Sequence, residues 1–103
     1  MAFDLLSMVL KETPGATIQI TGHTETRMLS AQEVTQFQDM MGLGVFMARS
    51  LRDALVEDFG VEASRVVIAS AGSERPVAEN DTPAGQRANR RLVVLIDEPV
   101  RVP

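Results

Sequence analysis

The chain contains no cysteine, and no apolar run approaches the roughly 20 residues needed to span a bilayer as a helix. The lack of cysteine excludes disulfide bonds and thiol chemistry, but it does not indicate a compartment, because exported bacterial domains can lack cysteine too. Residues 1–10 show neither a basic segment nor a small-residue cleavage site, so no signal peptide is recognised. The sequence therefore predicts no membrane span in this segment.

The charge balance is acidic, with a net charge of −4 over 103 residues. An acidic surface repels phosphate, which argues against non-specific binding to nucleic acid. Hydrophobic residues make up 45% of the chain and charged residues 23%, proportions typical of one globular domain with a single core.

No arrangement of residues typical of catalysis is present. The chain has no Ser-His-acid spacing, no phosphate-binding glycine loop and no pair of carboxylates suited to acid–base chemistry. His23 is the only histidine, and we interpret it as a loop residue that hydrogen-bonds its own strand end. The sequence therefore predicts no enzyme, no cofactor and no metal site.

Hydrophobic periodicity predicts alternating elements in the order α-β-α-β-α-β, with helices packed on a sheet. Right-handed crossovers favour parallel pairing of at least one strand pair. Residues 23–39 are polar and aperiodic, so we expect a loop with one helical turn. The expected strands span residues 16–22, 64–72 and 90–97. The expected helices span residues 2–12 and about 41–59, the second ended by Gly60. A third, short helix is expected to begin with Thr82 as N-cap and Pro83 in its first position.

Three segments carry recognisable motifs. "GHTE" follows a strand at Gly22–Glu25, Leu43 and Ala48 lie near the start of the long helix, and "RPVAENDTPAGQRANRR" covers Arg75–Arg91. In this order they resemble the motifs of the OmpA-like C-terminal domain family, the non-covalent peptidoglycan-binding module of outer-membrane proteins, Pal lipoproteins and the MotB stator subunit. The resemblance covers nearly everything from Ile18 to Ile96, and the long loop after Glu25 looks more like the MotB type.

The resemblance implies an α/β (α+β) fold, a two-layer sandwich of a mixed sheet with two long helices on one face. It implies a single OmpA-like domain over residues 1–103, with a motif-bearing core at 16–97. The strand that precedes the first helix in this family is not recognised here. The implied location is the periplasm or cell envelope of a Gram-negative bacterium, and the implied partner is the peptidoglycan stem peptide.

The ligand-binding positions implied by the resemblance differ from the family pattern. Glu25 replaces an aspartate, Met47 replaces an arginine that binds a ligand carboxylate, and Gln86 replaces another arginine. Met has no hydrogen-bond donor, and losing a charge-assisted pair typically costs a few kcal/mol, or on the order of a hundredfold in affinity. We expect Glu25, Met47 and Gln86 to lie close together at one end of the sheet. The site residues implied by family position are Thr24, Glu25, Leu43, Met47, Gln86 and Arg90.

Two functions follow from this mixture of matches and departures. One is a peptidoglycan-binding, envelope-anchoring domain. The alternative is a degenerate OmpA-like domain that acts as a structural or protein-interaction module, with other envelope proteins or a second copy of itself as partners. Flexible methionine side chains suit an adaptable apolar contact surface. The methionines in and after the long loop are Met28, Met40, Met41 and Met47.

Charged residues near the last strand also allow two interpretations. Arg87, Arg90 and Arg91 stand before that strand, and we favour a structural role for them over anion binding. Successive strand residues face opposite sides, so one of Arg90 and Arg91 is expected to pair with a carboxylate and the other to be exposed. Glu25 is either a ligand for an ammonium group or a solvated loop acid.

Overall fold

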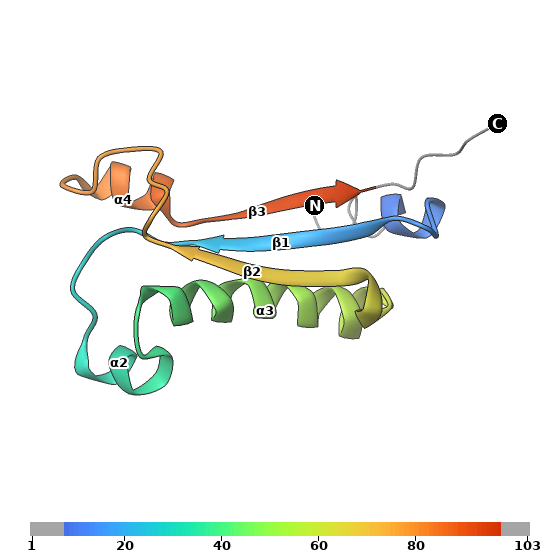
Figure 1. Ribbon diagram of the computed structural model, residues 1–103, viewed down its shortest axis with the longest axis horizontal. Helices are drawn as coiled ribbons and strands as arrows, with labels where there is room; N and C mark the ends of the chain where they lie inside the picture. Colours follow the sequence, from blue (N-terminus) through green and yellow to red (C-terminus); the bar gives the residue numbers. More distant parts are fainter. Residues whose placement is uncertain (1–7, 98–103) are drawn as a thin grey trace.

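A mixed three-stranded sheet forms the centre of the computed structural model, which describes residues 8–97 (Figure 1). The strands are β1 (Thr17–His23), β2 (Val66–Gly72) and β3 (Arg91–Asp97). β1 lies in the middle, parallel to β2 and antiparallel to β3. The predictions of three strands in one sheet, and of at least one parallel pair, are therefore confirmed.

One face of this sheet is apolar and forms the core. Ile18 and Ile20 of β1 are almost completely buried, and Ile20 lies opposite Ile68 of β2 and Val94 of β3. Because side chains alternate along a strand, the intervening Gln19 faces the opposite side. Helix α3 (Met40–Phe59) packs along the apolar face (Figure 1).

Helix α3 is positioned by its caps and by one buried stripe. The Asp39 carboxylate accepts a hydrogen bond from the Gly42 N–H at the start, and Gly60 ends the helix in the left-handed conformation. The predicted helix near residues 41–59, ended by Gly60, is thus confirmed. Its buried residues recur at helical spacing and are Gly44, Ala48, Leu51 and Leu55.

Helix α2 (Ala31–Phe37) corrects the expectation of a loop through residue 39. None of its residues is buried, so it has no apolar periodicity that would reveal it. A local signal does exist: Ser30 and Glu33 form a capping box, in which each side chain bonds the other residue's backbone N–H. This helix is therefore specified by its first turn and not by a buried face.

Helix α4 (Pro83–Asn89) begins as predicted, with the Thr82 hydroxyl accepting from the Gly85 N–H and proline in the first turn. Of the helix expected at 2–12, residues 8–12 are helical and the rest lies outside the described residues. Two long helices were expected on one face, and the described residues contain one, α3. No helix within 8–97 is long and apolar enough to cross a membrane.

The start of α3 approaches the sheet at two glycines. A Cβ atom on Gly22 would overlap the carbonyl oxygen of Gly44, and a Cβ on Gly44 would overlap the Ser70 hydroxyl. The first of these neighbours is backbone, which cannot rotate away as a side chain can. The absence of a side chain at Gly22 thus sets how closely α3 approaches the ends of β1 and β2.

Replacing Gly22 with alanine tests this close approach. Because the added methyl group meets helix backbone, we expect Gly22→Ala to lower the free energy of unfolding by about 3 kcal/mol or more. Gly60→Ala is the matched control: nothing lies within 4 Å of its Cβ position, and only the left-handed backbone is unfavourable, at roughly 1–2 kcal/mol. Urea unfolding measures both, and equal losses in the two variants would contradict the close-approach argument.

Candidate functional site

The candidate site lies where β1 and β2 end and β3 begins, with α2 and α4 at the same end of the sheet (Figure 1). The backbone leaving β1 is held inside the protein: His23, Thr24 and Glu25 are 5%, 3% and 1% exposed. The Thr24 N–H donates to the Gly72 carbonyl at 2.8 Å, which carries the pairing with β2 past the end of β1. Three successive polar side chains are therefore buried at a strand end.

The Glu25 carboxylate is neutralised by two arginines. The Arg27 Nε donates to Glu25 Oε1 at 2.7 Å, and the Arg90 Nε lies 2.9 Å from Glu25 Oε2 in an ion pair without hydrogen-bond alignment. A buried carboxylate is strongly disfavoured unless it is paired, so these contacts account for its burial. The interpretation of Glu25 as a solvated acid is therefore wrong, whereas the expected carboxylate partner of Arg90 is present.

Arg27 also binds a second carboxylate, that of Glu33 in α2. Its Nη1 donates to Glu33 Oε1 at 2.9 Å and its Nη2 to Glu33 Oε2 at 2.7 Å, the bidentate geometry that suits a guanidinium. Hydrogen bonds from Arg27 and then from the Ser30 backbone lower the pKa of Glu33 to about 2. The two carboxylates in turn raise the pKa of Arg27, the Glu33 bond contributing most.

Sequence analysis did not identify Arg27 as a site residue. No motif marks it, because its two contacts depend on how the loop after β1 folds back onto α2. The capping box at Ser30 was the one local signal that placed Glu33 at the start of a helix and therefore near this loop.

Asn89 holds the loop that precedes α4. Its side chain is fully buried, and Oδ1 accepts from the N–H groups of Val77 and Ala78 at 2.8 and 3.0 Å. Its Nδ2 donates to the Ala78 carbonyl and to Asn80 Oδ1. Asn80 Oδ1 also accepts from the Thr26 N–H at 2.9 Å. One amide side chain at the end of α4 thus connects residues 77–80 to the chain leaving β1.

Among the six expected site residues, the described part of the chain shows one direct side-chain contact, that of Arg90 with Glu25. Thr24 and Glu25 are adjacent, Arg90 pairs with Glu25, and the Gln86 Nε2 donates to the Asn80 carbonyl at 2.9 Å. Leu43 and Met47 are half-buried and lie on α3, on either side of the glycine that contacts Gly22. No hydrogen bond or ion pair joins these two to the others within residues 8–97.

His23 and Arg91 differ from expectation. The His23 Nδ1 has no hydrogen-bond partner among the described residues, and burial followed by the charges of Arg91 and Arg75 lowers the pKa of its imidazole. One of Arg90 and Arg91 was expected to pair with a carboxylate and the other to be exposed. Arg90 has the carboxylate, but Arg91 is half-buried and donates to the carbonyls of Asn89 and Arg75 at 3.2 and 2.9 Å. Both arginines at the start of β3 therefore hold the fold together, one through a carboxylate and one through backbone.

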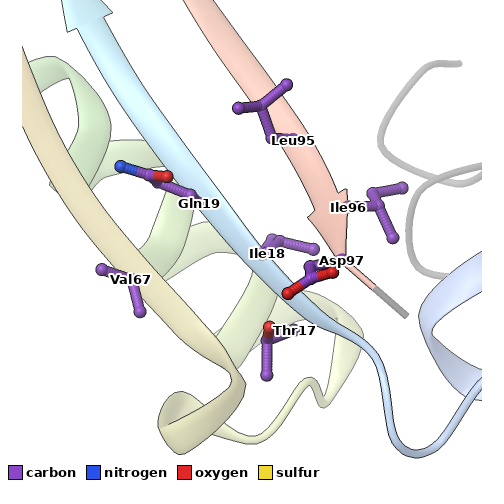
Figure 2. A pocket seen from close by; sticks show the side chains of 7 residues that line it. All are labelled: Thr17, Ile18, Gln19, Val67, Leu95, Ile96 and Asp97. Atoms are coloured by element: carbon purple, nitrogen blue, oxygen red, sulfur yellow. The ribbon is translucent and has the colours of Figure 1, made fainter. Parts of the chain in front are cut away.

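A hollow of about 600 Å³ lies at the opposite end of the sheet, around the start of β1 and the end of β3 (Figure 2). Its lining includes Val67 and Leu95, whose side chains are more than half exposed, and Asp97 is its one ionisable residue. Among the described residues that line it, none is a cation. The arginine–carboxylate contacts of Glu25 lie at the other end of the sheet.

Removal of the Asn89 side chain tests the loop connection. Asn89→Ala removes a fully buried amide and the acceptor for the N–H groups of Val77 and Ala78, so we expect it to lower the free energy of unfolding by about 3 kcal/mol or more. Arg87→Ala, at an exposed position in the same helix, is expected to change it by less than about 0.5 kcal/mol. Urea unfolding compares the two, and faster amide exchange at Val77 and Ala78 identifies the cause. A similar small effect in both variants would show that Asn89 does not hold this loop.

The Arg27–Glu33 pair makes stability depend on pH in the acid range. The Glu33 pKa is about 2 in the folded protein against an ordinary value of 4.5, so its contribution is complete above about pH 4.5 and is lost as the pH falls toward 2. Glu33→Gln removes this contribution. We expect the variant to lose less stability than the unmodified chain between about pH 6 and about pH 3, measured by urea unfolding. Parallel stability curves for the two proteins would rule out the pair as the source.

Comparison with known proteins places these motifs in a family. The OmpA family model matches residues 1–90. Outer membrane porin F of Pseudomonas aeruginosa is 33% identical over 92 residues, covering 89% of this chain and 24% of the porin. The chain thus spans about a quarter of the length of this relative.

Solved structures share the fold. The C-terminal domain of MotB from Helicobacter pylori superposes with a TM-score of 0.82 at 21% identity, over 96% of this chain and 73% of that one. The peptidoglycan-associated lipoprotein from Burkholderia pseudomallei gives a TM-score of 0.76 at 28% identity, over 92% of this chain and 74% of that one. With the family model matching most of its length, the chain belongs to the OmpA family.

Proposed function

We propose that this domain anchors its parent protein non-covalently to peptidoglycan in the periplasm of a Gram-negative bacterium. The observation that carries the proposal is the Glu25 carboxylate, which is buried at the end of β1 and paired with arginines from two separate segments. The relatives support the same location, since one is named as an outer membrane porin and another as a peptidoglycan-associated lipoprotein.

The charges at this end of the sheet suit a stem peptide. Diaminopimelate carries both ammonium and carboxylate groups, so a site for it needs an anion and a cation close together. Glu25 offers the anion. Arg90 offers the cation: its side chain is 51% exposed, and it makes no other ion pair within residues 8–97. A guanidinium has five N–H donors and can hold two carboxylates at once.

Met47 bears on the strength of binding. Family members with an arginine at this position gain a charge-assisted pair that Met47 cannot make. We therefore propose that this domain binds stem peptide more weakly than such members, and that its remaining binding comes from Glu25 and the arginines around it.

Co-sedimentation with purified peptidoglycan tests the proposal. Glu25→Gln keeps the shape of the side chain and removes its charge, so we expect the bound fraction to correspond to at least a tenfold weaker affinity. Met47→Arg is expected to strengthen binding by adding a donor. Glu57→Gln, an equal change of charge on an exposed part of α3, is the control and should bind as the unmodified chain does. If Glu25→Gln binds as well as this control, the site is not at Glu25.

A second function has one supporting observation, a set of exposed apolar side chains in the loop after β1, in α2 and in the first half of α3. Such a surface suits a contact with another envelope protein or a second copy of the domain. Failure of the unmodified chain to sediment with peptidoglycan, together with a dimer in analytical ultracentrifugation, would favour this alternative. The exposed side chains that form the surface are Met28, Val34, Met41 and Phe46.

A further inference from the structure

Arg27 holds one carboxylate inside the protein and another at its surface. Its Nε is bound to Glu25, which is 1% exposed, and its two Nη atoms are bound to Glu33, which is 26% exposed. The inner contact therefore belongs to the fold, whereas solvent and solutes can reach the outer one. Exposed ion pairs contribute little net stability, so another carboxylate can replace Glu33 at small cost.

Two further polar atoms lack partners in the residues just before Glu25. The His23 Nδ1 and the Thr24 Oγ1 have no hydrogen-bond partner among the described residues, and both side chains are more than nine-tenths buried. The Glu25 Oε2 makes an ion pair with Arg90 but no hydrogen bond. Most buried polar atoms in proteins are hydrogen-bonded, so unpaired atoms in successive residues support a ligand at this end of the sheet.

Helix α2 is attached weakly enough to move. It buries no residue, and its ring contact to α3 is that of Phe37 with Phe46, at 4.9 Å between ring centroids. Glu33 also links it to the chain leaving β1, through the ion pair with Arg27. Segments with few buried apolar contacts open locally at low free-energy cost.

We propose that Glu33 competes with the ligand for Arg27. Its carboxylate occupies the guanidinium that a carboxylate of the stem peptide binds when the ligand is present. Ligand binding exchanges one carboxylate for another on the same two Nη donors and releases α2 from the end of the sheet. Arg27 thereby supplies the donor that Met47 lacks. The inference rests on the proposed function and adds a residue and a regulation to it.

A competitor on the same chain acts at a high effective concentration, in the millimolar range for short flexible links. Removing it therefore strengthens binding. Glutamine at the third helical position preserves the capping box, so Glu33→Gln removes the competing charge and leaves the start of α2 intact.

Calorimetric titration with a synthetic stem tripeptide ending in diaminopimelate tests the proposal. We expect Glu33→Gln to bind about tenfold more tightly than the unmodified chain, and Glu57→Gln, the control, to bind equally. Arg27→Gln should bind more weakly than either. In the unmodified chain, amide exchange within α2 should quicken when the peptide is added, because its attachment at Glu33 is lost.

Each contrary result has a separate meaning. Equal affinity of Glu33→Gln and the unmodified chain, with clear binding by both, overturns the competitor and leaves the peptidoglycan function standing. Undiminished binding by Arg27→Gln overturns the role of Arg27 in the same way. No binding by any variant overturns the proposed function and this inference with it.

Discussion

The buried charge of Glu25 is the constraint on which this end of the molecule depends. A carboxylate that is 1% exposed requires cationic partners, and they come from two segments far apart in the sequence, the loop after β1 and the junction of α4 with β3. Pairing with Arg90 ties β3 to the chain leaving β1. Pairing with Arg27 shapes the loop and, through Glu33, holds α2. One side chain thus connects the chain leaving β1 with the junction before β3 and, through Arg27 and Glu33, with α2, which buries no residue of its own.

Two uncharged features hold this arrangement in place. Gly22 lets the start of α3 approach the sheet to backbone contact, and Asn89 satisfies the backbone of the loop that precedes α4. Both act by geometry and not by charge. The fold of the family is present, and its close approach and its loop depend on these two uncharged residues.

The guanidinium groups beside Glu25 come from the loop after β1 and from the end of α4, whereas Met47 on α3 has no hydrogen-bond donor. Arg27 also brings the carboxylate of Glu33 to this end of the sheet. The charges of the two arginines and the two carboxylates therefore balance.

Local sequence determined the three strands, the long helix ended by Gly60 and the short helix begun by Thr82 and Pro83. Alternation, helical spacing and capping act over a few residues and need no knowledge of the rest of the chain. The motifs around Gly22 and Asn89 were likewise sufficient to indicate the family. The capping box at Ser30 also specified α2 locally, although the lack of a buried face made that helix look like a loop.

Only the tertiary structure decided the burial of Glu25 and the identity of its partners. An acid after a strand is as compatible with solvent as with the interior, and the choice depends on which cations the folded chain brings within about 3 Å. Arg90 is 65 residues away in sequence, and Arg27 is close but turns inward because the loop returns to α2. Long-range electrostatic pairing leaves no periodic signal in a single sequence. The partners of Glu25 are therefore fixed only by the folded arrangement of strands and loops.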